Sequence, residues 1–234
     1  IMYRDIPDDV PTLVPDPCLT FTSWNAAYEE ALVGIPVQPY AGSPSATCNA
    51  LLTDELTANG TDVLVVRHAD TCAAGSTNCA ADTSGPLYFQ TSNCITELDA
   101  GDFYSIDPNS YALTERDCVT TADKRLFVQN IYFIKNNVDG IPSLYRSQFG
   151  SSGGALGQLT AQEIVPGVER IRVELGIDSL SETGEVIDYT KEVDWQDPDD
   201  WTVPTNRGDG IPDNAFVHCS NSGTSPCALA DLTN

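Results

Sequence analysis

Apolar segments of strand length, separated by polar stretches rich in glycine and proline, set the hydrophobic pattern of this chain. Residues 61–67 form a continuous run of apolar and β-branched side chains, which is typical of a strand buried on both faces. Residues 168–177 alternate between apolar and polar side chains, which indicates a strand with one face in solvent. We expect further strands at residues 87–90, 111–115, 125–135, 143–149 and 186–190.

Helical patterning is confined to one segment. Residues 24–33 combine alanine, leucine and glutamate, and Ser23 or Asn25 is available as the N-cap. Prolines in residues 1–17 predict an extended lead-in, because proline removes a hydrogen-bond donor and restricts the residue before it. Residues 150–158 are rich in glycine and serine and predict a flexible loop.

These patterns together predict an α+β protein that is predominantly antiparallel β. We expect a single domain with a lead-in at residues 1–58, a sheet core at residues 59–190 and an acidic, disulfide-closed loop region at residues 191–234. The length of 234 residues is sufficient for one substantial core.

Charge narrows the range of partners. The formal net charge is -23, from 34 acidic and 11 basic residues, so the chain opposes binding to nucleic acid phosphates and to anionic lipid surfaces. The composition suits a protein in a saline or calcium-containing medium.

The eight cysteines lie almost entirely in polar, turn-rich segments, which indicates disulfides and an oxidising compartment. Zinc binding would need closer cysteine pairs with histidine support, and the chain has two histidines. We expect pairs between neighbours along the chain, one of many arrangements that eight cysteines allow: Cys72 with Cys79, Cys219 with Cys227, Cys94 with Cys118, and Cys18 with Cys48.

Four strings follow one another in a distinctive order. Residues 59–72 read NGTDVLVVRHADTC and residues 125–136 read RLFVQNIYFIKN, followed by DGIPSLYRSQF at residues 139–149 and QEIVPGVERIRVELGID at residues 162–178. In this order and spacing they resemble the PilW-like minor pilins of bacterial type IV pili, whose pattern includes a "GIP-LYR" strand, a "GVE" segment and an acidic D-G loop. The matching positions are Gly140, Ile141, Pro142, Leu144, Tyr145, Arg146, Gly167, Val168 and Glu169.

The resemblance implies a pilin-like sheet and a role in assembly, with no catalytic residues. A protein of this kind helps to initiate a pilus at the bacterial inner membrane, passes through the periplasm and ends outside the cell in the fibre, near its tip. Its partners are other minor and major pilins, and a surface receptor or glycan is a further expected contact.

The same family pattern includes a hydrophobic N-terminal helix and a further C-terminal strand. No window of this sequence approaches the roughly twenty apolar residues that a membrane span needs. We therefore expect both ends of the chain to be shorter than in the family.

The acidic segment NRGDGIPDN, residues 206–214, is a candidate calcium loop, with Asn206, Asp209, Asp213 and Asn214 as the candidate ligands. Alternating oxygen ligands and a glycine at a sharp turn are what calcium loops use. The alternative is an Asp-Gly turn capped by its own side chains. Arg207 and Thr205 stand where a calcium loop prefers acidic or amide side chains.

Catalytic interpretations of the sequence are weaker. Residues 150–154 satisfy G-x-S-x-G, so that Ser152 and His218 follow a hydrolase order, but the motif requires a turn between a strand and a helix. His68 lies beside Asp70 and is better explained as a hydrogen-bonded structural histidine. An extracellular hydrolase therefore stays an alternative without an assigned site.

A second alternative is a calcium-dependent adhesin or a carbohydrate-binding domain. Large aromatic side chains provide rigid contact area for sugars and proteins when they are exposed, and they pack under loops when they are not. The residues in question are Trp24, Tyr40, Tyr189, Trp195 and Trp201.

Overall fold

The computed structural model describes residues 13–42, 45–51, 60–137, 139–188, 191, 196–214 and 216–218. Its strands are β1 (Val37–Tyr40), β2 (Val63–Ala73), β3 (Tyr88–Thr91), β4 (Tyr104–Ser105), β5 (Lys124–Asn136), β6 (Pro142–Ser152), β7 (Ala155–Gln158), β8 (Gln162–Pro166), β9 (Glu174–Leu175) and β10 (Val217–His218). Its helices are the 3-10 turn η1 (Phe21–Ser23), α1 (Ala26–Gly34), α2 (Ala46–Leu51), α3 (Ile95–Asp99) and α4 (Pro198–Thr202).

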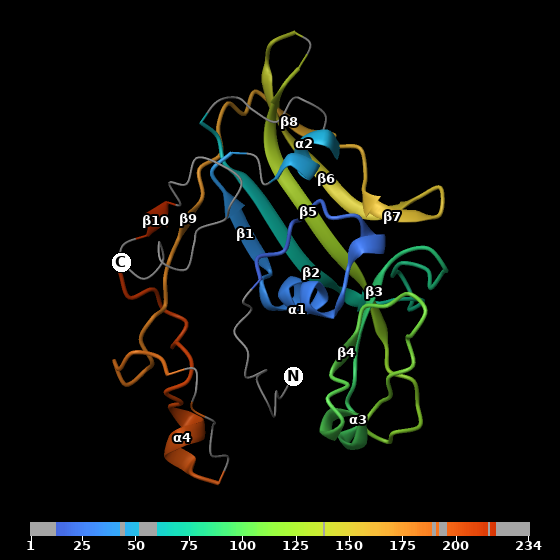
Figure 1. The fold of residues 1–234 in the computed structure, drawn as a ribbon, viewed down its shortest axis with the longest axis vertical. Coiled ribbons are helices and arrows are strands. Elements are labelled where there is room, and N and C mark those ends of the chain that lie inside the picture. The colour runs from blue at the N-terminus through green and yellow to red at the C-terminus, as the bar shows by residue number, and fades with distance from the viewer. Residues whose placement is uncertain are drawn as a thin grey trace.

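An antiparallel sheet forms the centre of the molecule, as the sequence predicts (Figure 1). β5 is its longest strand and pairs with β2 along one side. On the other side, β3 pairs with the first residues of β5 and β6 pairs with the last ones. β1 continues the sheet beyond β2, and β8 continues it beyond β6.

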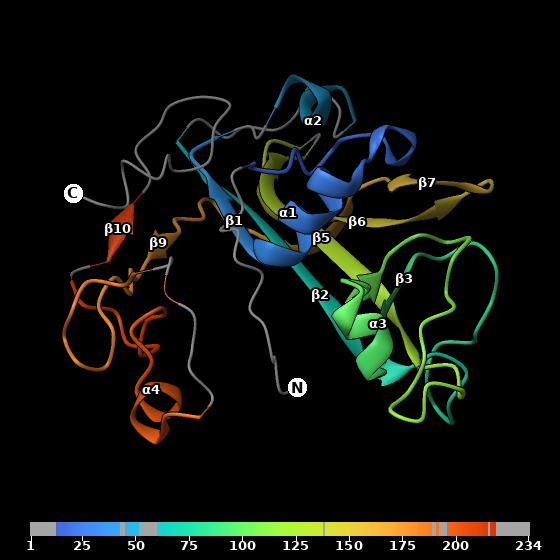
Figure 2. The same cartoon turned by 60° about the horizontal axis from the view of Figure 1, so that its bottom comes forward.

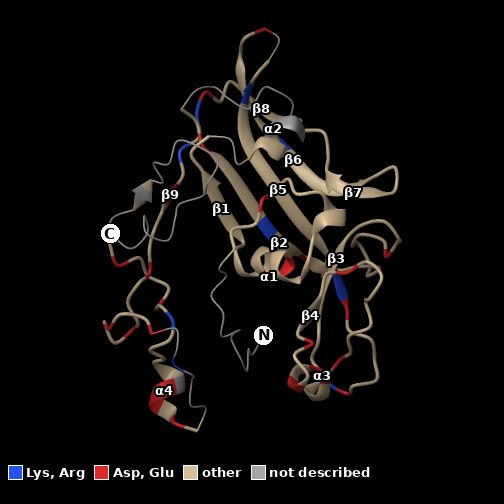
Figure 3. Cartoon of the chain, in the orientation of Figure 1, with Lys and Arg blue, Asp and Glu red and all other residues tan. Residues whose placement is uncertain are grey.

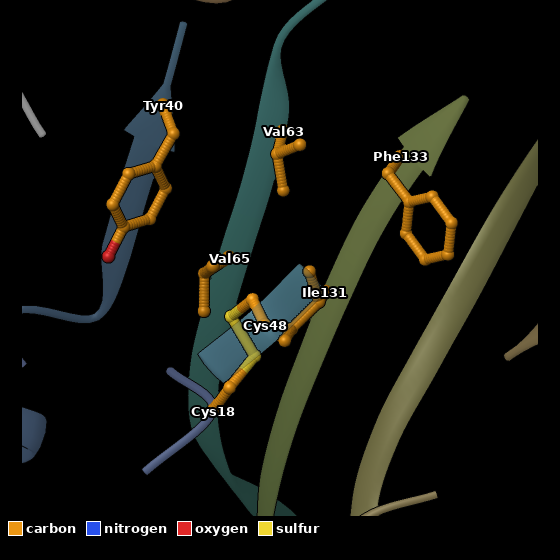
Figure 4. Packing of buried hydrophobic residues seen from close by; sticks show 7 residues of the cluster. All are labelled: Cys18, Tyr40, Cys48, Val63, Val65, Ile131 and Phe133. Atoms are coloured by element: carbon orange, nitrogen blue, oxygen red, sulfur yellow. A yellow bond between two sulfur atoms is a disulfide. The ribbon is translucent and has the colours of Figure 1, made fainter. Parts of the chain in front are cut away.

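One face of this sheet carries α1 and α2 (Figure 2). Alternate residues of β5 point to this face, where Phe127 packs with Tyr28 and Leu32 of α1, and Ile131 and Phe133 pack with the Cys18–Cys48 disulfide. Figure 4 shows the second group, in which the disulfide lies over Val63, Val65 and Ile131 (with Tyr40 and Phe133 beside them). Removing a large side chain from such a core typically costs about 3–5 kcal/mol.

Helix α1 begins where the sequence places it. The side chain of Asn25 accepts a hydrogen bond from the Tyr28 amide at 2.9 Å, which is the N-cap interaction expected of asparagine. Trp24, at the start of this segment, stacks on Phe149 with ring centroids 5.2 Å apart. Trp24 and the buried Tyr40 are therefore parts of the core, which for these two aromatic side chains decides between the two alternatives in favour of packing.

The core also contains a buried polar network around Arg67, whose side chain is 3% exposed. Its guanidinium donates to Gln129 Oε1 at 2.6 Å, to Gln38 Oε1 at 2.5 Å and to the Ile35 carbonyl at 3.0 Å. Its Nη2 atom is buried without a hydrogen-bond partner. Burial of the guanidinium lowers the pKa of Arg67 to about 10.

A strap at residues 14–19 crosses this network, and side chains from the sheet bind its carbonyl groups. Gln38 Nε2 donates to the Pro15 carbonyl at 3.0 Å, and Gln129 Nε2 donates to the Pro17 carbonyl at 2.9 Å. The Tyr28 hydroxyl donates to the carbonyl of Asp16. Cys18 then fixes the end of the strap through its disulfide with Cys48.

Two sections of the chain extend from the sheet (Figure 1). The lobe, residues 74–123, contains β3, α3 and β4. It lies at the end of β5 that starts with Lys124. The arm, residues 168–218, runs past β1 and contains β9, α4 and β10. Figure 3 shows acidic residues on the lobe and the arm, whereas the strands of the sheet carry few of them.

Several strand predictions differ from the structure. Residues 168–177 form a strand only at β9, and residues 111–115 contain only an isolated bridge from Thr114 to Thr121. In the 186–190 segment, Val186 makes an isolated bridge to Leu180, and residues 189 and 190 lie outside the described part. The expected flexible loop at residues 150–158 is instead a hairpin of β6 and β7.

Candidate functional site

The strings that matched the family pattern meet at one end of the sheet. β6 contains Leu144, Tyr145 and Arg146, and β8 precedes Gly167. The two strands pair, and the Gly167 amide donates to the Pro142 carbonyl at 2.8 Å. Gly167 has φ +79°, a conformation that glycine adopts without strain, so the glycine permits the turn that makes this contact.

Tyr145 ties this end of the sheet to the core. Its ring stacks on Phe133 with centroids 6.0 Å apart, and its hydroxyl donates to the side-chain oxygen of Asn137. Asn137 in turn donates through Nδ2 to Ser143 Oγ at 3.0 Å and to Glu163 Oε1 at 3.1 Å. The matched tyrosine therefore joins β5, the turn after it, β6 and β8.

The turn itself leaves apolar surface exposed. Gly140 has φ +80°, and the Ile141 amide donates to Asp139 Oδ1 at 3.0 Å, so this turn is capped by its own aspartate. Ile141 is 49% exposed, and Val165 of the neighbouring β8 is 44% exposed. Val168 is half-buried, and Glu169 is exposed. This end of the sheet thus presents apolar side chains on a rigid support.

The arm is fastened to the start of β2. The Asp62 amide donates to the Ile171 carbonyl at 2.9 Å, and the Ile171 amide donates to Thr61 Oγ1 at 3.0 Å. The Val173 amide donates to Asp62 Oδ2 at 2.7 Å. Side chains of residues 61 and 62 therefore bind the segment whose alternation predicted a strand, which explains why it joins no sheet there.

The acidic loop of the arm does not bring its predicted ligands together as a cage of carboxylates. Asp209 Oδ1 accepts a hydrogen bond from the Ile211 amide at 2.7 Å, and Asp213 Oδ2 accepts from the amides of Ser179 and Leu180 at 2.6 and 2.8 Å. These hydrogen bonds hold the pKa of Asp213 below its ordinary value, and the bond from the Ser179 amide has the largest effect. Asn214 is exposed. Asp209 caps its own turn, and Asp213 caps the opposite segment of the arm.

A residue that the sequence did not single out, Asp178, lies against this loop. Its Oδ2 accepts from the Gly210 amide at 2.6 Å, and its Oδ1 is buried without a hydrogen-bond partner. A β-carbon placed on Gly208 would lie 2.1 Å from the carboxyl carbon of Asp178, so only glycine fits at position 208. Asn206 donates through Nδ2 to the Lys191 carbonyl at 3.0 Å, and its Oδ1 is also buried without a partner.

Within the described ranges, one group of three potential metal-binding side chains has its ligand atoms within 4.8 Å of one another: Asp16, Cys18 and Cys48. Both cysteines are joined in a disulfide, so their sulfur atoms are not available as thiolate ligands. Asp16 Oδ1 instead accepts from the Cys18 amide at 2.9 Å and from Ser45 Oγ at 3.0 Å.

The residues considered for catalysis occupy separate places. Ser152 ends β6 and enters the hairpin to β7, while His218 lies in β10 and contacts Asp62 at 2.9 Å. His68 is exposed, with Nδ1 3.1 Å from the Ala69 carbonyl, and Asp70 Oδ1 accepts from the Cys72 amide at 3.2 Å. The expected link between His68 and Asp70 is thus replaced by separate contacts of each side chain with the main chain.

Three of the four expected disulfides are present: Cys18–Cys48, Cys72–Cys79 and Cys94–Cys118. The cysteines of the fourth, Cys219 and Cys227, lie outside the described residues, as do Tyr189 and Trp195. Each of the three bridges joins neighbours along the chain, which is the pattern that local pairing in turn-rich segments predicts.

The described residues therefore form an antiparallel sheet protein with three disulfides, two helices on one face of the sheet and an acidic arm. The sequence pattern of the family described as Type IV Pilus-assembly protein W (PilW) matches residues 131–225, from the second half of β5 to beyond β10. This match connects the chain with type IV pilus assembly. No curated protein and no solved structure matches the chain. None of the helices in the described ranges is long and apolar enough to cross a membrane.

Proposed function

We propose that this chain is a minor pilin of PilW type, which takes part in initiating a type IV pilus and lies near the tip of the fibre. The observation that carries the proposal is the family match over residues 131–225, which includes the meeting of the Gly140–Arg146 and Gly167–Glu169 strings. The envelope and the exterior of the cell are the expected locations, where the disulfides are stable.

Exposed apolar side chains at the matched end of the sheet suit a contact with another pilin. Ile141, Ile164 and Val165 are each more than 40% exposed, and all three lie in the matched residues. A rigid strand pair beneath them lowers the entropy lost on binding. We assign this surface to a neighbouring pilin subunit, which would cover apolar area that otherwise stays in water.

The test uses the bacterium that carries this chain. Its deletion is expected to reduce surface pili counted by electron microscopy, and the wild-type chain is expected to restore them. Ile141→Asp and Val165→Asp are expected to fold normally, since both sites are exposed, and to restore few pili. The matched control is Val119→Asp, at a site that is 82% exposed and outside the matched residues. Normal piliation after deletion would refute the proposal.

A second candidate property is calcium binding by the arm, favoured by the two buried oxygen atoms that accept no hydrogen bond, Asp178 Oδ1 and Asn206 Oδ1. Calcium prefers carboxylate and amide oxygens, which is the chemistry of these two atoms. On this proposal, Asp178 and Asn206 are ligands, and Asp209 and Asp213 shape the turn around them.

Thermal unfolding with calcium and with a chelator tests this second proposal. Calcium is expected to raise the melting temperature of the wild type, as any ligand of the folded state does. Asp178→Asn is expected to abolish the rise, whereas Asp139→Asn, which changes a turn aspartate outside the arm, is expected to keep it. An unchanged melting temperature in the wild type would mean that the loop is held by its own hydrogen bonds alone.

A further inference from the structure

A cavity of about 490 Å³ opens in the lobe, beside the end of β5 that starts with Lys124. Its lining includes Asp82, Pro86, Pro108, Asn109, Tyr111 and Lys124. None of these residues belongs to the matched strings or to the arm. The volume falls within the range of roughly 300–1,000 Å³ that is usual for small-molecule sites.

Inside the cavity, Lys124 is held by contacts with Asp82, Tyr88 and Tyr111. Its Nζ lies 2.8 Å from Asp82 Oδ1 and 4.9 and 5.1 Å from the ring centroids of Tyr88 and Tyr111. The Tyr111 hydroxyl accepts from the Tyr88 amide at 2.7 Å and donates to the Tyr88 carbonyl at 3.1 Å. Each of these polar groups is therefore held in place before a ligand arrives.

One wall, residues 82–86, rests on the loop that the Cys72–Cys79 disulfide closes. A β-carbon placed on Gly75 of that loop would lie 3.4 Å from the Asp82 β-carbon, so the two segments are in contact. The Tyr88 hydroxyl also binds this wall, since it donates to the Ala81 carbonyl at 3.1 Å and accepts from the Thr83 amide at 3.2 Å. The disulfide thus supports the position of Asp82.

Pro108 and Asn109 of the lining belong to a turn that Asp107 caps. Its Oδ1 accepts from the main-chain amide of Asn109 at 2.9 Å and from the Asn109 side chain at 3.1 Å. Ser105 Oγ donates to the Ser110 carbonyl at 2.8 Å. Because hydrogen bonds fix these parts of the lining, little conformational entropy remains to be lost on binding.

The lining separates an apolar part from a polar part. Pro86, Pro108 and the ring of Tyr111 offer C–H and aromatic surface, whereas Asp82 accepts hydrogen bonds and Lys124 donates them. A sugar ring has the same division, with C–H groups on its faces and hydroxyls around its rim. Each hydroxyl both donates and accepts, so adjacent hydroxyls can bind the carboxylate and the ammonium together.

The charges of the lining and of the whole chain indicate whether the ligand is charged or neutral. Asp82 and Lys124 already neutralise each other, so an anion or a cation that is attracted by one of them is repelled by the other. The net charge of -23 adds a long-range repulsion of anions. We infer that this cavity is a binding site for an uncharged sugar residue, such as the terminal unit of a neutral glycan.

This inference extends the proposed function, because it would give a pilin at the fibre tip a ligand. Only this biological role rests on the proposed function, and sugar binding itself does not. Binding is measured on the purified chain and piliation in cells. A failure of one assay therefore leaves the result of the other standing.

The experiment titrates the isotope-labelled chain with glucose, galactose, mannose and N-acetylglucosamine, up to about 50 mM, and follows the amide signals by NMR. Glucosamine and glucuronate serve as cationic and anionic analogues of the same ring. We expect at least one neutral sugar to shift the amides of Gly85 and Asn109, and the anionic glucuronate to bind about tenfold more weakly.

Two variants assign the binding to the cavity. Asp82→Asn and Lys124→Met are expected to weaken it by about tenfold. The controls are Asp139→Asn and Lys135→Met, because Lys135 also lies over a tyrosine ring, at the other end of β5. The inference is overturned if no neutral sugar shifts these amides, if a charged analogue binds more tightly, or if the two cavity variants bind like the controls. The wild-type titration alone decides the first two of these outcomes, even if a variant fails to fold.

Discussion

Asp62 and His218 are 156 positions apart in the chain, and the histidine Nε2 lies 2.9 and 3.1 Å from the two carboxylate oxygens. Asp62 is 5% exposed and also accepts the Val173 amide. His218 belongs to β10, which pairs with β9 where the arm lies against the sheet. This one carboxylate therefore fastens both sides of the arm to the start of β2.

His218→Ala is expected to loosen the arm by about 1–3 kcal/mol, because it leaves a buried carboxylate with one partner fewer. Hydrogen exchange measured by mass spectrometry should show faster exchange at the amides of residues 171–175, with little change in β5. The control is His68→Ala, since His68 is exposed and its Nδ1 lies 3.1 Å from the carbonyl of the next residue, Ala69. Unchanged exchange at the Val173 amide would show that the pair does not hold the arm.

Arg67→Met is expected to lower the free energy of unfolding by about 3 kcal/mol or more, since it removes the donor from two glutamine oxygens and a carbonyl inside the core. Arg67→Lys should recover little of this, because an ammonium cannot reproduce the planar fork of donors. Denaturant unfolding measures both.

Arg172→Met provides the control for Arg67, because Arg172 forms an exposed ion pair with Glu174 and should lose less than about 1 kcal/mol. Equal losses at positions 67 and 172 would contradict the assigned role of the network.

Alkaline pH is expected to destabilise the fold. Burial raises the pKa of Tyr111 from 10.0 to about 12, and it raises the pKa of Tyr28 and Tyr40 as well. The stability that these tyrosines contribute is complete below pH 10 and is lost as the pH rises through their folded pKa values, because the unfolded chain releases protons first. Arg67 acts in the opposite direction, since its folded pKa is lowered.

The net loss above pH 10 is on the order of 1–3 kcal/mol per pH unit, from Tyr28, Tyr40 and the more exposed Tyr111 against Arg67. Ultraviolet absorbance of phenolate in the folded chain, beside denaturant midpoints at several pH values, measures both effects. Tyr111→Phe should remove the step near pH 12. Titration of every tyrosine at its ordinary pKa would contradict the assigned burial.

Removing the Cys18–Cys48 bridge should cost more than removing Cys72–Cys79. The first bridge spans 30 positions and the second spans 7, and loop entropy alone makes the longer bridge about 1 kcal/mol more stabilising. Cys18 and Cys48 are also buried in the core beside Ile131, so replacing both by alanine leaves a cavity. Melting temperatures of the two double variants provide the comparison.

The sequence predicted the central strands because their apolar runs are long and continuous. β2, β5 and β6 lie where residues 61–67, 125–135 and 143–149 indicated, although each is longer than expected. The failure at residues 168–177 has a specific cause: Thr61 and Asp62 bind that main chain through side chains, and hydrophobic alternation cannot reveal such a partner. Short elements such as α3 and α4 gave no periodic signal at all.

At the candidate sites, too, the sequence does not reveal partners that only the fold brings together. The resemblance placed residues 140–146 and 167–169 in one family pattern without indicating a contact, and the fold brings them together through the Gly167 amide and the Pro142 carbonyl. Similarly, Asp178 lies in the string that ends before the acidic loop, and only the folded arm brings it against Gly208. The Lys124 cavity joins residues from three separate segments, none of which carries a motif.

The strap at residues 14–19 is held through its carbonyl oxygens, which accept hydrogen bonds from Gln38 and Gln129 of the sheet and from Tyr28 of α1. Proline lacks an amide hydrogen but keeps its carbonyl, so Pro15 and Pro17 are fully competent here and also stiffen the segment. The strap is held by side chains as well, since the Asp16 carboxylate accepts from the Cys18 amide and from Ser45, and Leu19 packs against the core. Val14, which is 45% exposed, is therefore the position of the strap where a label or a tether should be tolerated.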